Sequence, residues 1–249
     1  MMKKYAKVFL ILLLSAGVML AAGFYIWSRF TYTPSDELLK AVDENRIQEQ
    51  NQILFADPFD SKPSAGVILY PGAKVEPEAY AYIAQELADR GIAAAVPEMP
   101  FHFSIFGTGK ADDVRRARPN VQNWYVGGHS LGGVAAANYA KENEESVKGV
   151  FFLASYPAES ANLKKTGLDV LSIYGTNDGL TSPQDIENSK AYTPKDAIFK
   201  EIRGGNHAQF GLYGPQKGDM EANIPAIEQQ NQIVRYLEEW ISKDSIGEK

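Results

Sequence analysis

Several residue types and patterns are missing from this chain, and each absence excludes a class of protein. The 249 residues contain no cysteine, so the chain forms no disulfide bond and carries no lipid-modified cysteine of a lipoprotein. Only three histidines are present, and no His, Asp and Glu cluster has the spacing of a metal site. No complete phosphate-binding glycine loop occurs. The net charge of −6, without a basic stripe beyond the N-terminus, disfavours nucleic acid. We therefore expect no metal, no cofactor and no nucleic-acid partner.

One long apolar run is present, and it lies at the N-terminus. The basic residues 1–7 precede an uncharged stretch, Val8 to Ser28, which is long enough to span a bilayer. Aromatic residues gather at its far end, as is typical of a membrane interface; they are Phe24, Tyr25, Trp27 and Phe30. The lysines predict a cytoplasmic N-terminus, a single-pass cell-membrane protein and a domain outside the membrane. The alternative is a cleaved signal peptide, which would leave a secreted protein.

The rest of the chain has the pattern of an α/β protein. Apolar residues make up 45% and charged residues 22%, which is ordinary for a globular domain. We divide the chain into an anchor or signal peptide (1–30), a linker with N-terminal strands (31–65) and a core (66–249). Strands and helices alternate in the core, which predicts a doubly wound, mainly parallel sheet flanked by helices. The expected strands are 66–70, 92–96, 123–126, 147–153, 170–174 and 197–203; the expected helices include 77–90, 110–117, 183–191 and 226–242.

The motif Gly128-x-Ser130-x-Gly132 follows the expected strand 123–126 and opens an Ala-rich segment. A serine displayed on a tight turn between a strand and a helix needs small residues two positions away on each side. The turn also places the serine at a helix N-terminus, where free N–H groups favour negative charge. The motif therefore predicts that Ser130 is a nucleophile, against the alternative of an ordinary turn with a solvated serine.

The base that such a serine needs is a histidine, and the order along the chain selects one. Where a serine occupies this kind of turn, an acid and then a histidine follow it in the sequence. His102 lies upstream, and His129 is adjacent to Ser130, so that its side chain points away from the hydroxyl. His207 alone has the required position, in a glycine-flanked loop after an apolar strand.

The acid that orients the histidine is expected between Ser130 and His207, at the carboxyl end of a strand. Asp178 fits, because it follows the apolar run 170–174. Asn-Asp-Gly is also ordinary turn chemistry, which is the alternative interpretation of this position. Its predicted role is to hold the imidazole in the correct tautomer without taking the proton.

An oxyanion hole needs two backbone donors. One is expected to be the N–H of Leu131, the residue after the serine. The other is expected from the loop after the strand 66–70, where the Ala73 amide is the candidate and Lys74 a poorer one.

These motifs together resemble the alpha/beta-hydrolase superfamily, in particular its compact, dienelactone-hydrolase-like branch of the fold-5 type. The resemblance spans residue 66 to the C-terminus, and four segments carry it in the family's order: 69–73, 127–133, 172–179 and 204–210. Two features depart from the family. Pro71 and Gly72 stand where many members have His-Gly, which affects the second oxyanion donor. Dienelactone hydrolases use a cysteine nucleophile, so that activity is not carried over to this chain.

Two loops are expected to form the walls of the site. Members of the superfamily often carry a lid between the strands that end near 153 and begin near 168, but only 154–167 is available here, so we expect little or no lid. The loops 97–106 and 210–223 are the alternatives, and they supply three possible substrate-binding residues, Phe101, His102 and Tyr213.

The resemblance implies a serine hydrolase that cleaves a carboxylic ester or thioester through an acyl-enzyme. Its catalytic residues would be Ser130, Asp178 and His207, and its substrate a small-molecule or lipid-like ester. Three alternatives stay open: acyl transfer to another acceptor, a membrane-anchored binding protein without turnover, and an envelope protein whose function lies in the anchor. The sequence does not determine the oligomeric state.

Overall fold

Eight strands of the described chain form one sheet in the order β1-β2-β4-β3-β5-β6-β7-β8. The computed structural model describes residues 2–59 and 62–246. The edge pair β1–β2 and the contact β2–β4 are antiparallel, and all other neighbours are parallel. The strands are β1 (Gln48–Gln50), β2 (Ile53–Ala56), β3 (Ala65–Tyr70), β4 (Ile92–Pro97), β5 (Trp124–His129), β6 (Gly149–Leu153), β7 (Asp169–Gly175) and β8 (Ile198–Ile202).

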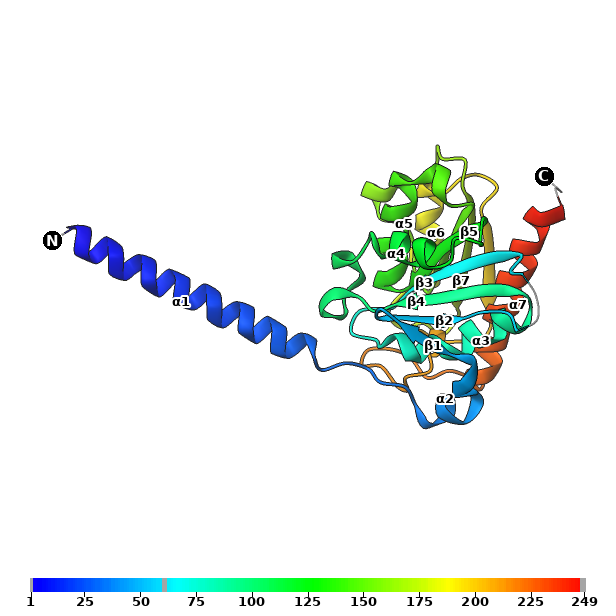
Figure 1. Cartoon of the computed structure of the whole chain (residues 1–249), viewed down its shortest axis with the longest axis horizontal. Coiled ribbons are helices and arrows are strands. Elements are labelled where there is room, and N and C mark those ends of the chain that lie inside the picture. Colours follow the sequence, from blue (N-terminus) through cyan, green and yellow to red (C-terminus); the bar gives the residue numbers. More distant parts are fainter. Residues whose placement is uncertain (1, 60–61, 247–249) are drawn as a thin grey trace.

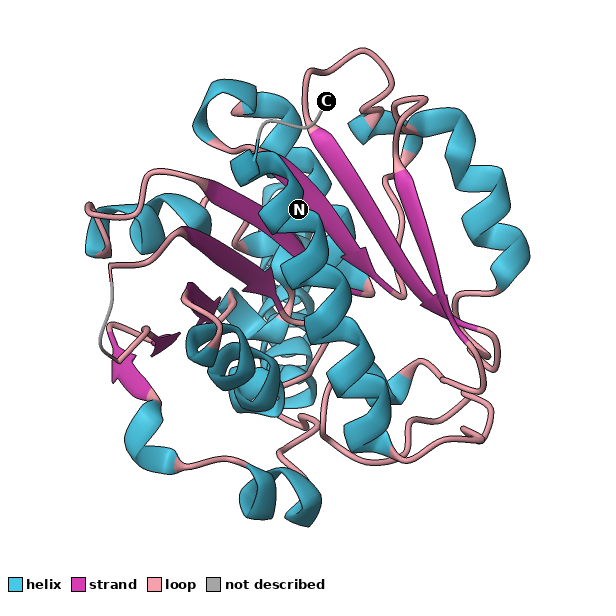
Figure 2. Ribbon diagram, turned by 90° about the vertical axis from the view of Figure 1, so that its right-hand side faces the viewer, coloured by secondary structure: helices cyan, strands magenta, loops and turns pink. Residues whose placement is uncertain are grey.

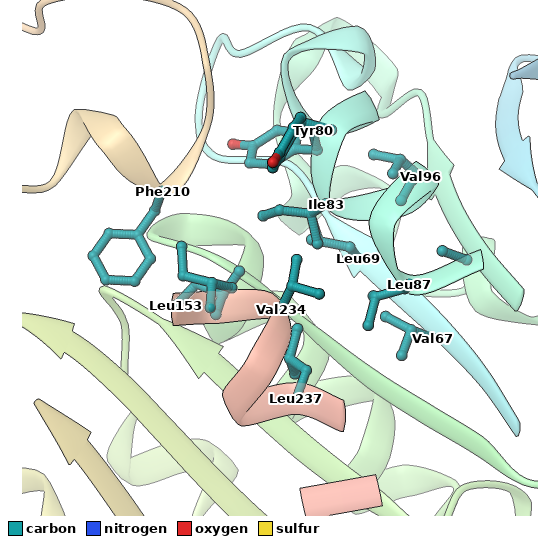
Figure 3. Close-up of a cluster of buried hydrophobic side chains, with 14 of the residues drawn as sticks. Val67, Leu69, Tyr80, Ile83, Leu87, Val96, Leu153, Phe210, Val234 and Leu237 are labelled. Carbon is teal, nitrogen blue, oxygen red and sulfur yellow. The ribbon is translucent and has the colours of Figure 1, made fainter. Parts of the chain in front are cut away.

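The central strands are apolar along their whole length because helices cover both faces of the sheet (Figure 2). Side chains of β3 alternate between two cores, with Val67 and Leu69 in one and Ile68 and Tyr70 in the other. Helices α3 (Ala81–Asp89) and α7 (Ala226–Ile246) supply the first core, which Figure 3 shows. Helices α4 (Lys110–Ala117) and α5 (Leu131–Glu142) supply the second.

Two shorter helices complete the domain. Helix α2 (Asp36–Ala41) begins at Ser35, whose hydroxyl accepts the N–H of Leu38. Helix α6 (Pro183–Ser189) begins with a capping box between Ser182 and Asp185. Single turns of 3-10 helix occur in the loops, among them η3 (Pro100–His102), η4 (Ser104–Phe106) and η6 (Glu159–Ala161).

Helix α1 (Met2–Ser28) extends away from the domain (Figure 1). Its segment Tyr5–Ser28 has a mean hydropathy of 2.3 and residues 5–27 are exposed, so by length and composition the segment is able to cross a membrane. A signal sequence has the same length and composition.

The predicted α/β architecture is confirmed, with strand and helix ends shifted by a few residues. The expected helix 77–90 divides into a 3-10 turn, η2 (Pro77–Tyr80), and α3. The segment 154–167 holds only the short turn η6, which agrees with the expectation of little or no lid. Strand β2 pairs with β4, so part of the predicted linker region belongs to the sheet. Residue 1 of the predicted anchor and residues 247–249 of the predicted core lie outside the described residues.

Candidate active site

Ser130 lies between β5 and α5 in a strained backbone conformation. Its φ of 52° and ψ of −122° are unusual for a residue with a side chain. A Cβ on Gly128 would approach the carbonyl carbon of Gly132 to 2.5 Å, and a Cβ on Gly132 would approach the Pro71 oxygen to 2.6 Å. The two glycines are therefore required by the close packing of strand, turn and helix, as the motif predicts.

The turn is also held by hydrogen bonds to the last residue of strand β6 and to Ser155 in the loop after it. The Ser130 N–H donates to the Leu153 oxygen at 3.0 Å. The Ser155 hydroxyl donates to the Ser130 oxygen at 2.6 Å. These bonds occupy the main chain of Ser130 and leave its side chain free to act.

The backbone amides of Leu131 and Ala73 have no hydrogen-bond acceptor in the described part of the chain. Both neighbours of Ala73 are engaged: the Gly72 N–H donates to the Tyr80 hydroxyl at 2.9 Å, and the Lys74 N–H donates to the His102 oxygen at 2.7 Å. Lys74 is therefore unavailable as an oxyanion donor, whereas the Ala73 amide is free.

Asp178 and His207 are in direct contact, in loops that follow β7 and β8. The Asp178 oxygens lie 2.9 and 3.1 Å from His207 Nδ1, and the side chains are only 0% and 1% exposed. Oδ1 of Asp178 also accepts the N–H groups of Leu180 (2.8 Å) and Thr181 (2.6 Å). The carboxylate is thus fixed by its own loop and fixes the imidazole in turn.

The opposite nitrogen of the imidazole is unpaired. His207 Nε2 is buried and has no hydrogen-bond partner among the described residues. The Ser130 hydroxyl likewise makes no hydrogen bond to a described residue. In proteins without bound substrate, such catalytic hydrogen bonds are often long and tighten on binding. Of the three predicted catalytic residues, the structure therefore joins Asp178 to His207 and leaves the Ser130 contact unmade.

His129 lies against the imidazole of His207, with ring centroids 4.6 Å apart. The Tyr80 hydroxyl accepts the Gly72 N–H, so its own proton is directed to His129 Nδ1, 2.9 Å away. Burial lowers the pKa of His129 well below its ordinary value, and the proximity of His207 lowers this pKa further. His129 is therefore a neutral, buried neighbour that packs against the candidate base.

Asp219 is a functional residue that the sequence did not reveal. Its carboxylate accepts N–H groups from both loops of the Asp–His pair: those of His207 (3.2 Å) and Ala208 (2.8 Å), and that of Gly179 (3.0 Å). One side chain thus ties the acid loop to the histidine loop. No motif marks Asp219, because all of its partners are main-chain groups.

Gln229 of α7 forms hydrogen bonds with the loop that carries His207. Its oxygen accepts the Asn206 N–H at 3.0 Å, its nitrogen donates to the Asn206 oxygen at 2.9 Å, and the residue is fully buried. A signal for it was present in the sequence, since Gln229 shares a helix face with the core residues Ile233 and Leu237. A polar residue in an apolar stripe indicates a buried hydrogen bond.

The three predicted pocket residues contact other parts of the chain. Phe101 is 46% exposed and lies against Phe24 of α1. His102 Nε2 lies 3.3 Å from an Arg29 nitrogen. Tyr213 is buried and bonded to Gln216. Their role in substrate binding stays a prediction.

Within residues 2–59 and 62–246, no group of three or more His, Asp or Glu side chains is arranged to hold a metal ion. The Nδ1 atoms of His207 and His129 are already bonded, to Asp178 and Tyr80. The expectation that the reaction needs no cofactor stays a prediction.

Comparison with a protein-family model gives a match over residues 66–231, described as the alpha/beta hydrolase family. The matched segment contains the turn of Ser130 and the loops of Asp178 and His207. It accounts for more than half of the chain and confirms the resemblance that the motifs indicate. A search of the curated proteins found no match.

Solved structures of low sequence identity share the fold. One chain from the structural work on LipS and LipT, two metagenome-derived lipolytic enzymes, matches with a TM-score of 0.61 and 13% identity, over 79% of this chain and 100% of that one. A dienelactone hydrolase from Anabaena variabilis matches with 0.58 and 16%, over 79% and 98%. Est1E from Butyrivibrio proteoclasticus, solved with ferulic acid, matches with 0.57 and 14%, over 79% and 99%.

Proposed function

The chain belongs to the alpha/beta hydrolase family and is a hydrolase, and from the geometry of its site we propose that it cleaves carboxylic esters or thioesters by a Ser-His-Asp mechanism. The proposal rests on the hydrogen bonding of the two ring nitrogens of His207. Its Nδ1 is held by the buried Asp178, its Nε2 is buried and unpaired, and its ring lies 4.6 Å from that of His129, the residue before Ser130. An imidazole bonded in this way presents a free lone pair, which is what a general base for a serine needs.

The reaction proceeds through an acyl-enzyme. Ser130 Oγ attacks the carbonyl carbon while His207 Nε2 takes the hydroxyl proton, and the C–O or C–S bond to the leaving group then breaks as His207 returns that proton to it. Water attacks the acyl-enzyme with His207 again as base, which releases the acid and restores the Ser130 hydroxyl. Asp178 stabilises the imidazolium throughout without taking its proton.

The negative charge of the tetrahedral intermediate falls on the former carbonyl oxygen. The free amides of Leu131 and Ala73 are its proposed donors, and the N-terminus of α5 adds its dipole. The packing of Gly132 against the Tyr70 and Pro71 oxygens supports this assignment, because it brings the start of α5 against the loop that carries Ala73.

We further propose that α1 is retained as a membrane anchor, with the hydrolase domain outside the cytoplasmic membrane. The basic start of the chain supports this orientation. Contacts between the end of α1 and the domain support retention: the Phe24 ring lies 5.7 Å from that of Phe101, and the Trp27 ring lies 5.6 Å from that of Phe103. A segment destined for cleavage needs no such packing.

The test compares Ser130→Ala with Ser160→Ala in the full-length protein, using p-nitrophenyl esters from acetyl to palmitoyl. Ser160 is exposed and far along the chain from the site, so its variant controls for the loss of a hydroxyl. We expect ester turnover to vanish in Ser130→Ala and to persist in Ser160→Ala. Equal turnover in the two variants would remove Ser130 from the mechanism.

A further inference from the structure

The exposed apolar side chains of the domain gather at the edge of the sheet that carries the candidate site. Among the described residues outside α1, nine large apolar side chains are exposed, and six of them lie in loops that follow the carboxyl ends of β4, β6, β7 and β8. Those six are Phe101, Ile105, Phe106, Tyr156, Leu180 and Met220. Ser130, Asp178 and His207 follow strand ends at the same edge.

The end of α1 joins this surface through aromatic contacts. The Phe24 ring lies 5.7 Å from that of Phe101 and 6.3 Å from that of Phe106, and the Trp27 ring lies 5.6 Å from that of Phe103. Phe101 and Phe106 nevertheless stay 46% and 53% exposed. The apolar surface of the helix therefore continues onto the loop without a break.

Polar contacts hold the helix end against the loop of the proposed oxyanion donor. The Lys74 ammonium lies 4.2 Å from the Trp27 ring centroid. The Tyr32 N–H donates to the Lys74 oxygen at 2.7 Å, and the Glu76 N–H donates to the Tyr32 oxygen at 3.0 Å. Lys74 directly follows Ala73, so the anchor and the candidate site are joined without a flexible linker.

The same loop also contacts the start of the nucleophile helix. The Ser104 hydroxyl donates to the Pro71 oxygen at 2.6 Å, and α5 packs against the turn Ser104–Phe106. A surface formed by this turn and the end of α1 therefore lies against the start of α5, the helix that follows Ser130.

We propose that the bilayer-facing patch, formed by Phe24, Trp27, Phe101, Ile105 and Phe106, rests on the outer leaflet and that the enzyme takes a membrane-resident acyl ester from it. This inference rests on the proposed function and on retention of α1. Aromatic and apolar side chains at the end of a spanning helix occupy the interfacial layer. A site held at that layer receives an acyl chain directly from the leaflet, whereas a soluble ester needs no such surface.

A lipid surface, rather than a protein partner, is indicated by continuity with α1. Residues 5–27 of α1 are exposed and need lipid around them if the helix crosses the membrane. The patch continues this surface, and two cations, Arg29 and Lys74, stand at its border beside His102 and Trp27. Basic side chains at that height are suited to the phosphate layer of a bilayer.

The position of the patch is testable without any activity, because the chain has no cysteine and a single introduced thiol can be labelled alone. Ile105→Cys and, as control, Leu39→Cys carry a nitroxide in the full-length protein in phosphatidylcholine vesicles. Ile105 and Leu39 are 46% and 57% exposed, so both sites accept the label. We expect the label at 105 to collide with oxygen and to be shielded from a water-soluble nickel chelate, and the label at 39 to show the reverse. Equal exposure to nickel overturns the proposal, and so does shielding from both reagents, which would mean that a protein partner or a second copy covers the patch.

The substrate class is tested in the same vesicles with Ile105→Ser/Phe106→Ser and the control Leu39→Ser/Phe59→Ser. A fluorogenic long-chain ester in the bilayer is compared with soluble p-nitrophenyl acetate. We expect the first variant to lose at least about 10-fold on the bilayer ester alone, and the control to keep both activities. Equal losses on both esters, or no loss on either, overturn the substrate assignment. Persistent activity of Ser130→Ala would instead overturn the proposed function, whatever the label at 105 reports.

Discussion

Replacing Asp178 by Asn keeps the shape of the side chain next to His207 and removes its negative charge. Oδ1 of Asp178 accepts two main-chain N–H groups, from Leu180 at 2.8 Å and Thr181 at 2.6 Å, and Oδ2 lies 2.9 Å from His207 Nδ1. An Asn oxygen in the Oδ1 position keeps both main-chain bonds. The opposite orientation would leave both N–H groups without this acceptor, and for the buried Thr181 N–H the cost is roughly 1–3 kcal/mol. The Asn therefore turns its NH₂ group to the imidazole.

An NH₂ group facing Nδ1 changes the tautomer of His207. Nδ1 becomes the acceptor, the proton moves to Nε2, and Nε2 loses the lone pair that would take the Ser130 proton. Wrong-tautomer substitutions of this kind lower kcat about 10⁴-fold in serine enzymes. That factor corresponds to roughly 5.4 kcal/mol in activation free energy. We expect the same order here, with the fold intact.

The assay is kcat and KM on p-nitrophenyl butyrate, together with ¹⁵N chemical shifts of the His207 imidazole. Asp196→Asn is the control, because Asp196 is exposed and away from the pair. The wild type is expected to carry its proton on Nδ1 and Asp178→Asn on Nε2. A loss of less than about 10-fold in a folded variant with an unchanged tautomer would refute the role assigned to Asp178.

Three further predictions concern the scaffold around the pair. Gly132→Ala places a Cβ against backbone oxygens and is expected to lower the free energy of unfolding by more than roughly 3 kcal/mol. The control is Gly109→Ala, where the Cβ meets open space, and its denaturation midpoint is expected to stay unchanged. Asp219→Ala is expected to lower kcat roughly 10- to 100-fold with KM nearly unchanged, because both loops of the pair lose their acceptor. Rate assays on a butyryl ester check this, and a pure KM effect contradicts it. The lowered pKa of His129 keeps this side chain neutral in the folded protein. Below about pH 6.5 the unfolded chain therefore binds one proton at His129 that the folded chain does not bind. Stability is therefore expected to fall with decreasing pH in that range, by up to roughly 1.4 kcal/mol per pH unit, and His129→Gln is expected to remove this part of the slope in urea titrations; an unchanged slope contradicts the assignment.

Local chemistry explains why much of the fold was predictable. Strands β3 to β7 are short, mainly apolar runs between turn residues, and each helix from α3 to α7 buries apolar side chains. The turn at Ser130 was recognisable because its two glycines are required by contacts within a few residues and with the adjacent strand. Asp178 was selected from its place after a strand, and its Oδ2 lies 2.9 Å from His207 Nδ1.

What the sequence did not reveal depends on contacts between distant segments. Asp219 lies in an irregular loop and binds main-chain N–H groups of two other loops, which leaves no periodic or motif signal. The packing of Phe24 and Trp27 on the loop after β4 is likewise a tertiary contact, so their aromatic character indicated only an interface. The pairing of Tyr80 with His129 joins residues that no local pattern relates.

Covalent trapping at Ser130 tests the central proposal most directly. The full-length protein is treated with a fluorophosphonate, digested, and mapped by mass spectrometry, with His207→Ala treated in parallel. We predict a single adduct on the peptide that contains Ser130 in the wild type and a strongly slowed reaction in His207→Ala, because the base that activates the hydroxyl is gone. An adduct at another serine, or labelling of Ser130 at the same rate without His207, would contradict the mechanism.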